Sequence, residues 1–173
     1  MASDVVVCDI EKHTILSSPV IFSKESFETF PTFSPDGQKL YYCSAPAMPM
    51  PDSICNLKYS LCSVSFNPEN GMFGNKVDTL FNASVKGQSV SFPRVSPDGH
   101  FLLCTLSDYG TFPIWHKEAD LYMINLQTGM GIIQKPQTVM ILKVTIPGRQ
   151  IVVGLCLAVV VWMVFIRVLS LSM

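Results

Sequence analysis

The sequence predicts an all-β protein in which one unit of four antiparallel strands is repeated along the chain. Residues 30–37 read Phe-Pro-Thr-Phe-Ser-Pro-Asp-Gly, and residues 92–99, 62 positions later, read Phe-Pro-Arg-Val-Ser-Pro-Asp-Gly. Self-similarity at a fixed interval indicates that a supersecondary unit is repeated. The 10 Gly and 12 Pro residues also fall mainly between short apolar runs, which is typical of all-β chains.

Each copy of the repeat ends in a predicted β-turn. The turn residues are Ser34, Pro35, Asp36 and Gly37 in the first copy and Ser96, Pro97, Asp98 and Gly99 in the second. Proline presets φ, aspartate bonds back to the backbone and glycine accepts a positive φ, so we assign these residues to structure rather than to catalysis or metal binding. An apolar segment follows each turn, so each turn closes a hairpin. Cys43 and Cys104 are predicted to hold the same strand position, as small buried side chains.

A second set of apolar runs supplies the remaining strands. Residues 4–10, 60–66 and 120–126 are strand-like, and turn residues follow the last two of these runs. Residues 76–81 and 19–22 are the expected fourth strands. Four antiparallel strands per repeat form the blade of a β-propeller. Residues 5–7 are then expected to end a preceding blade.

Residues 1–129 hold about two such blades, and we predict that they form a partial propeller. A closed ring needs at least four blades of about 40 residues each. We therefore expect the 173-residue chain to be a piece of a larger protein or to need a partner. Its N-terminus has no basic region followed by an apolar core, so a signal peptide is not predicted.

The C-terminal part differs from the repeat. Residues 130–150 are predicted to be a linker, and residues 151–173 are an apolar segment with the composition of a transmembrane helix. All 13 acidic residues lie at or before Asp120. Read one base back, the codons of Trp162 and Met163 encode Asp-Gly, where a third turn is expected. We therefore interpret residues from about Met130 onward as a frameshifted continuation of the propeller, which the encoding DNA would test.

The residues indicate no catalytic, cofactor or metal site. His13, His100 and His116 are far apart in the sequence, and the six cysteines show no haem or redox spacing. The formal net charge of −1 does not favour nucleic acid. A membrane contact is expected only if residues 151–173 are made as written.

One loop is a candidate for binding a protein partner. Tyr109, Phe112, Trp115 and His116 lie in the long connection between the second and third strands of the second blade. Such loops emerge on one rim of a propeller, and Tyr and Trp are common interface anchors. The alternative is that the aromatic side chains pack the loop against its own blade.

Residues 30–45 and 92–107 resemble the WD-repeat-like blades of TolB-like propellers. Residues 3–129 are most similar to large TolB-like proteins of gut Bacteroidetes, with residues 28–34 and 109–116 as the most specific stretches. The resemblance implies a non-enzymatic propeller of the cell envelope or periplasm that works by protein contact and carries no cofactor. The haem-like cysteine motif of some relatives has no counterpart in this sequence.

Three functions stay open at this stage. The first is a protein-interaction module of a bacterial envelope protein, with an unidentified protein partner. The second is the propeller part of an envelope enzyme, a peptidase or haem protein, whose active site lies outside this chain. The third is a small tail-anchored membrane protein.

Overall fold

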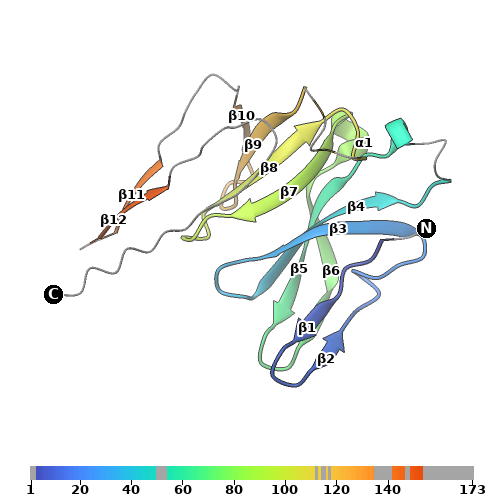
Figure 1. Ribbon diagram of the computed structural model, residues 1–173, viewed down its shortest axis with the longest axis horizontal. Helices are drawn as coiled ribbons and strands as arrows, with labels where there is room; N and C mark the ends of the chain where they lie inside the picture. Colours follow the sequence, from blue (N-terminus) through green and yellow to red (C-terminus); the bar gives the residue numbers. More distant parts are fainter. Residues whose placement is uncertain are drawn as a thin grey trace. The chain divides into compact units, whose positions relative to one another are not determined.

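The computed structural model describes residues 3–49, 54–111, 113, 116, 118–134, 142–146 and 149–153. The chain divides into two compact units, Met1–Gln134 and Lys135–Met173. The elements of the first unit, drawn in Figure 1, are β1 (Val7–Asp9), β2 (Thr14–Leu16), β3 (Ser26–Phe33), β4 (Lys39–Pro46), the 3-10 helix η1 (Ile54–Asn56), β5 (Ser60–Asn67), β6 (Met72–Phe81), α1 (Ala83–Lys86), β7 (Ser89–Val95), β8 (Phe101–Ser107), β9 (Asp120–Asn125) and β10 (Gly131–Gln134).

Two four-stranded antiparallel sheets form the body of this unit. Strands β3, β4, β5 and β6 follow one another in the first sheet, and β7, β8, β9 and β10 do so in the second. We call them blade 1 (residues 26–81) and blade 2 (residues 89–134). The predicted fold class, an all-β partial propeller, is confirmed by these sheets. Blade 2 continues five residues beyond the predicted end at Gly129, because β10 pairs with β9.

The Ser-Pro-Asp-Gly turns have the same hydrogen bonds in both blades. In blade 1, Ser34 Oγ accepts from the backbone N–H of Lys39 (2.9 Å) and Asp36 Oδ1 accepts from that of Gln38 (3.0 Å). Blade 2 repeats both bonds with Ser96 and Asp98. The two turn glycines have φ of 71° and 73°, which explains why glycine is needed there.

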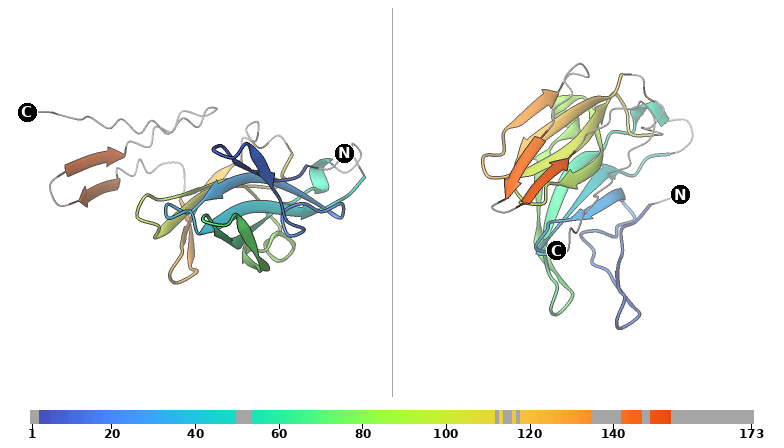
Figure 2. Two further views of the ribbon diagram at one scale, coloured as in Figure 1. Left: turned by 90° about the horizontal axis from the view of Figure 1, so that it is seen from below. Right: turned by 60° about the vertical axis from the view of Figure 1, so that its left-hand side comes forward.

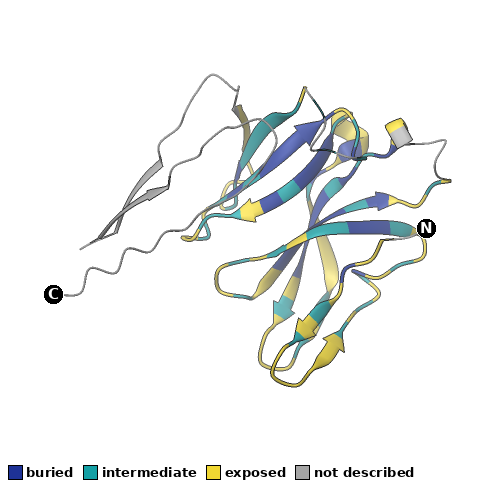
Figure 3. Ribbon diagram, viewed as in Figure 1, coloured by how far each residue is buried: buried dark blue, intermediate teal, exposed yellow. Residues whose placement is uncertain are grey.

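Strand β4 is buried on both faces because its neighbours cover it from both sides (Figure 3). Tyr41 and Cys43 face blade 2, while Leu40 and Tyr42 face the N-terminal segment. The core between the blades contains Phe27, Tyr41, Cys43, Ala45, Leu57, Tyr59, Leu61, Phe81, Val90, Leu102, Cys104, Leu106 and Ile124. The core on the other face contains Val5, Ile21, Leu40, Tyr42, Cys62 and Val64.

The N-terminal segment takes the position of a preceding blade. The N–H of Val90 in β7 donates to the carbonyl of Tyr59 in blade 1 (3.0 Å). At the matching place in blade 1, the N–H of Glu28 donates to the carbonyl of Ser3 (2.7 Å). The segment that precedes the hairpin β1–β2 (Figure 2) is therefore hydrogen-bonded to blade 1 as the segment that precedes β5 is hydrogen-bonded to blade 2.

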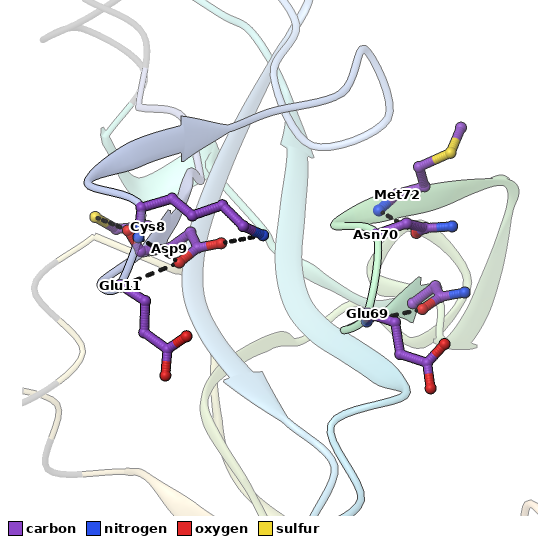
Figure 4. A network of polar contacts seen from close by, with 8 residues as sticks. Cys8, Asp9, Glu11, Glu69, Asn70 and Met72 are labelled. Atoms are coloured by element: carbon purple, nitrogen blue, oxygen red, sulfur yellow. Dashed lines mark hydrogen bonds and ion pairs between the residues drawn. The ribbon is translucent and has the colours of Figure 1, made fainter.

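Short polar side chains fix the turn between β1 and β2 and the turn between β5 and β6 (Figure 4). Asp9 Oδ1 accepts from the N–H of Glu11 (3.1 Å), and Asn70 Oδ1 accepts from the N–H of Met72 (3.0 Å). Aspartate and asparagine side chains favour turns by such bonds. Leu16 of β2 reaches Gly71 in the turn between β5 and β6, so the hairpins are in contact.

The prediction that Cys43 and Cys104 hold the same strand position is wrong. Cys43 pairs with Thr29, whereas the residue that pairs with the matching Ser91 is Thr105. The two Ser-Pro-Asp-Gly turns have equal length, so the register is offset by 62 throughout the first two strands. A shift of one residue turns a side chain to the other face of a sheet. Cys43 and Cys104 therefore approach the core between the blades from opposite sides.

The second unit contains one described hairpin, β11 (Leu142–Ile146) with β12 (Arg149–Val153). These strands lie where the sequence predicted a linker and the start of a helical apolar segment, so residues 151–153 are in a strand instead. The rest of the apolar segment, residues 154–173, lies outside the described residues. Within the described part of the chain, no helix has the length and apolar character needed to span a membrane.

Candidate functional site

The candidate site is the loop of residues 108–119, which joins β8 to β9 at the rim of blade 2. Of the four predicted binding residues, the structure describes Tyr109 and His116 and brings their rings into contact. Phe112 and Trp115 lie outside the described residues. The ring centroids of Tyr109 and His116 are 4.0 Å apart and the rings are tilted by 47°.

Hydrogen bonds fix the ring of His116 and the backbone at Tyr109. His116 Nε2 lies 2.9 Å from the carbonyl oxygen of Thr111, so this nitrogen carries the proton and donates. Ser107 Oγ donates to the carbonyl of Tyr109 (2.9 Å). His116 Nδ1 is buried and has no hydrogen-bond partner among the residues that the structure describes. The loop thus holds a pre-positioned pair of aromatic rings.

The same loop is fastened to blade 1 through Gly110. Its N–H donates to the carbonyl of Leu57 (2.7 Å), in the segment that leads into β5. A β-carbon at Gly110 would lie 2.3 Å from Cδ2 of Tyr59, so a larger residue does not fit. Tyr59 in turn donates its N–H to Ser89 Oγ (2.9 Å) at the start of blade 2. We call residues 55–59 together with residues 108–111, 113 and 116 the rim surface, since these contacts join the loops of both blades.

Gly110 was not identified from the sequence. Its neighbours in the loop are polar and aromatic, and nothing in that pattern shows that Tyr59, 51 positions earlier, packs against it. A glycine between Tyr109 and Thr111 was the available signal, because an isolated glycine often marks a close backbone approach.

Glu28 is a second feature that the sequence did not reveal. It lies in β3 with only 3% of its surface exposed; Oε1 accepts from Ser26 Oγ, and Oε2 has no partner among the described residues. Burial raises the pKa of this carboxyl, and the nearby carboxylate of Asp4 raises it further. Its side chain lies on the face of β3 that the N-terminal segment covers. Strand periodicity alone cannot show that this face is covered.

The buried cysteines are unsuited to nucleophilic chemistry. Burial raises the pKa of the Cys104 thiol to about 12 and raises that of Cys43 well above its ordinary value. Both thiols are therefore protonated at neutral pH, and the thiolate is the reactive form. Within the described residues, no group of three or more His, Cys, Asp or Glu side chains is arranged to hold a metal ion.

No protein-family model matches this chain, and no curated protein matches it. Among solved structures, it is similar to an oligogalacturonate lyase in complex with manganese, with 14% identity and a TM-score of 0.46, over 76% of this chain and 29% of the lyase. It is also similar to the acylaminoacyl peptidase of Pyrococcus horikoshii, with 20% identity and a TM-score of 0.35, over 77% of this chain and 18% of the peptidase. The chain spans less than a third of either protein's length.

The prediction of a non-enzymatic protein is contradicted by these similarities, because both solved structures are enzymes. At this level of identity neither similarity assigns an activity to this chain. Its architecture is given by its own strands: two consecutive four-stranded antiparallel sheets share one core. The chain is a partial β-propeller.

Proposed function

We propose that the two blades are a scaffold that presents the rim surface to a protein partner. The observation that carries this proposal is the contact between Tyr109 and His116 in a loop that Gly110 ties to blade 1. A loop held on a rigid scaffold is the usual place for a binding site in a β fold.

Three properties of the rim surface support binding. Tyrosine supplies a large apolar area with a polar tip, which is why it is frequent at interface centres. The ring contact and the hydrogen bonds of Ser107 and Thr111 hold the loop in place, so less entropy is lost when a partner binds. Asp108 and Glu118 at the ends of the loop are exposed and supply a charged margin.

We place this module in the bacterial cell envelope. This location rests on the resemblance of residues 28–34 and 109–116 to TolB-like proteins, and the identity of the partner is open. A fractionation of cells that produce the intact protein tests the location by itself.

The binding proposal is tested by site-specific photo-crosslinking. A benzophenone amino acid is placed at position 109, and at position 72 as the control. Met72, the first residue of β6, is 65% exposed and lies outside the rim surface. We expect a discrete crosslinked protein from position 109 only.

The crosslinked protein is then purified and its affinity for the chain is measured. Tyr109→Ala is expected to weaken binding by more than tenfold, since truncation of a hot-spot residue costs about 2 kcal/mol or more. Met72→Ala is expected to leave the affinity unchanged. Equal crosslinking from both positions, or an unchanged affinity for Tyr109→Ala in a folded protein, would contradict the proposal.

A further inference from the structure

We propose that blade 2 carries a docking face for a third four-stranded blade of the same repeat. We call this the far face and define it by Leu103 in β8, Leu121 and Met123 in β9, and Ile132 in β10. Leu103 pairs with Met123, and Met123 pairs with Ile132, so these side chains project from the same side of the sheet. The side chains of Leu102, Cys104 and Leu106 project from the opposite side, toward blade 1.

Blade 1 shows the role of the far face, because the equivalent face of blade 1 is covered by blade 2. Tyr41 matches Leu103, since Thr32 pairs with Tyr41 and Arg94, 62 residues later, pairs with Leu103. In the third strands, Leu61 pairs with Cys43 and Leu121 pairs with Thr105. Leu61 in blade 1 therefore matches Leu121 in blade 2. Tyr41 and Leu61 lie in the core that blade 2 closes.

The matched residues differ in burial. Tyr41 is 5% exposed and Leu61 is fully buried, whereas Leu103 and Leu121 are only half-buried. Ile132 is 56% exposed. An apolar face that is closed in one repeat and open in the next is the arrangement expected when a further repeat packs on it.

Two buried hydroxyl groups on the far-face side of blade 2 also lack partners. Ser91 in β7 and Thr105 in β8 pair with each other, and neither Ser91 Oγ nor Thr105 Oγ1 has a hydrogen-bond partner among the described residues. Buried hydroxyls are nearly always hydrogen-bonded in native proteins. Both hydroxyls are already covered within the chain, so the open part of the far face is the part formed by Leu103, Leu121, Met123 and Ile132.

The first strands of the two blades supply another repeated contact. Phe30 and Phe92 each precede a proline and have φ of 52° and 51°, and their rings are in contact, with centroids 4.5 Å apart and a tilt of 52°. A positive φ is strained for a bulky residue and persists only where packing holds it. The contact of Phe92 with the preceding blade predicts that a third blade places its own phenylalanine on Phe92.

The backbone bond between blades repeats as well. Ser3 accepts from Glu28, and Tyr59 accepts from Val90. Ala119 precedes β9 as Tyr59 precedes β5, so its carbonyl is placed to accept from the first strand of the next blade. The occupant is thus a blade with a Phe-Pro bulge in its first strand and apolar residues on the facing side.

The test inserts such a blade into the full chain. A copy of residues 82–134 is placed after Gln134, with leucine instead of methionine at the position of Met123, so that mass spectrometry distinguishes the copies. Oxidation of Met123 by hydrogen peroxide is followed with and without the insert, and Met72 serves as an exposed control. We expect the insert to slow oxidation of Met123 several-fold and to leave Met72 unchanged.

A pair of matched variants keeps the test decisive if the insert does not fold. Without the insert, Leu103→Glu is expected to leave the unfolding midpoint nearly unchanged, while Tyr41→Glu abolishes folding. With the insert, Leu103→Glu is expected to restore rapid oxidation of Met123. Equal destabilisation by both variants would overturn the proposal, because the far face would already be covered within the chain.

Two further results would also overturn it. One is rapid oxidation of Met123 in an insert-bearing protein whose circular dichroism shows the added β-sheet. The other is concentration-dependent protection of Met123 in the original chain together with a dimeric mass, which would identify a second copy of the chain as the occupant.

Discussion

Leu16, at the end of β2, packs directly against Gly71 in the turn between β5 and β6. A β-carbon at Gly71 would lie 2.7 Å from Leu16 Cδ1, and Gly71 has φ of 70°. This contact joins the N-terminal hairpin to the tip of blade 1. Glycine is therefore required there for two reasons, the backbone conformation and the space.

Gly71→Ala is expected to destabilise the protein more than Gly37→Ala does. Both glycines have a φ near 70°, but a β-carbon at Gly37 meets nothing within 4 Å. The backbone strain, about 1–2 kcal/mol, is common to both variants, and the clash with Leu16 adds about 1 kcal/mol for Gly71 alone. Urea unfolding measures the difference, and equal losses would show that Leu16 moves aside without cost.

Phe92→Gly is expected to be less destabilising than Phe92→Ala. In an ordinary strand glycine is about 0.5–1 kcal/mol worse than alanine. At φ of 51° alanine keeps the left-handed strain, about 1–2 kcal/mol, which glycine does not have. At this position the glycine variant should therefore be more stable than the alanine variant by about 1 kcal/mol. Free energies of unfolding decide this, with the same pair of substitutions at Phe101, where φ is not positive, as the control.

Glu28 is expected to make the fold less stable as the pH rises. Its pKa is raised in the folded state by burial, so the folded protein holds this proton more tightly than the unfolded chain. The stability that it contributes is complete below the unfolded pKa, near 4.5, and falls as the pH rises through the folded pKa.

Glu28→Gln should remove this dependence and raise the melting temperature at pH 7. Asp36 and Asp98 titrate with the opposite sign, since hydrogen bonds from Ser34 and Ser96 lower their pKa values and their contribution is lost only below pH 3.8. Melting curves between pH 4 and 8 separate the groups. An identical pH slope in wild type and Glu28→Gln would refute the assignment.

The described cysteines should differ in thiol reactivity. Cys8 and Cys55 are exposed, whereas Cys43, Cys62 and Cys104 are buried with raised pKa values. A maleimide at neutral pH is expected to label the first two in the native protein and the other three only after denaturant is added. Peptide mapping identifies each labelled cysteine. Labelling of Cys43 at the rate of Cys8 would contradict the burial of Cys43 in the core between the blades.

The turn chemistry made the fold predictable. Ser34 and Asp36 specify a tight turn by short-range bonds, and their repetition at Ser96 and Asp98 carried the prediction of blades. Local signals of this kind depend on residues a few positions apart, which sequence patterns record well.

Contacts between distant residues were not predictable in the same way. The proximity of Gly110 to Tyr59 and the burial of Glu28 depend on which face each strand presents and on how two blades pack. The strained backbone of Phe92 is set by its bulge and by the ring of Phe30, although the Phe-Pro pair itself is visible in the sequence. The cysteine register was misjudged because a one-residue shift leaves the apolar pattern of these short strands almost unchanged.

The backbone bond from Glu28 to Ser3, repeated from Val90 to Tyr59, bears on how the chain is made. The first strand of each blade donates this bond to a segment that was synthesised earlier. If the blades assemble in the order of synthesis, only the last completed blade has an uncovered face at any moment. Aggregation of nascent chains would then be limited to the one exposed blade face at the growing end.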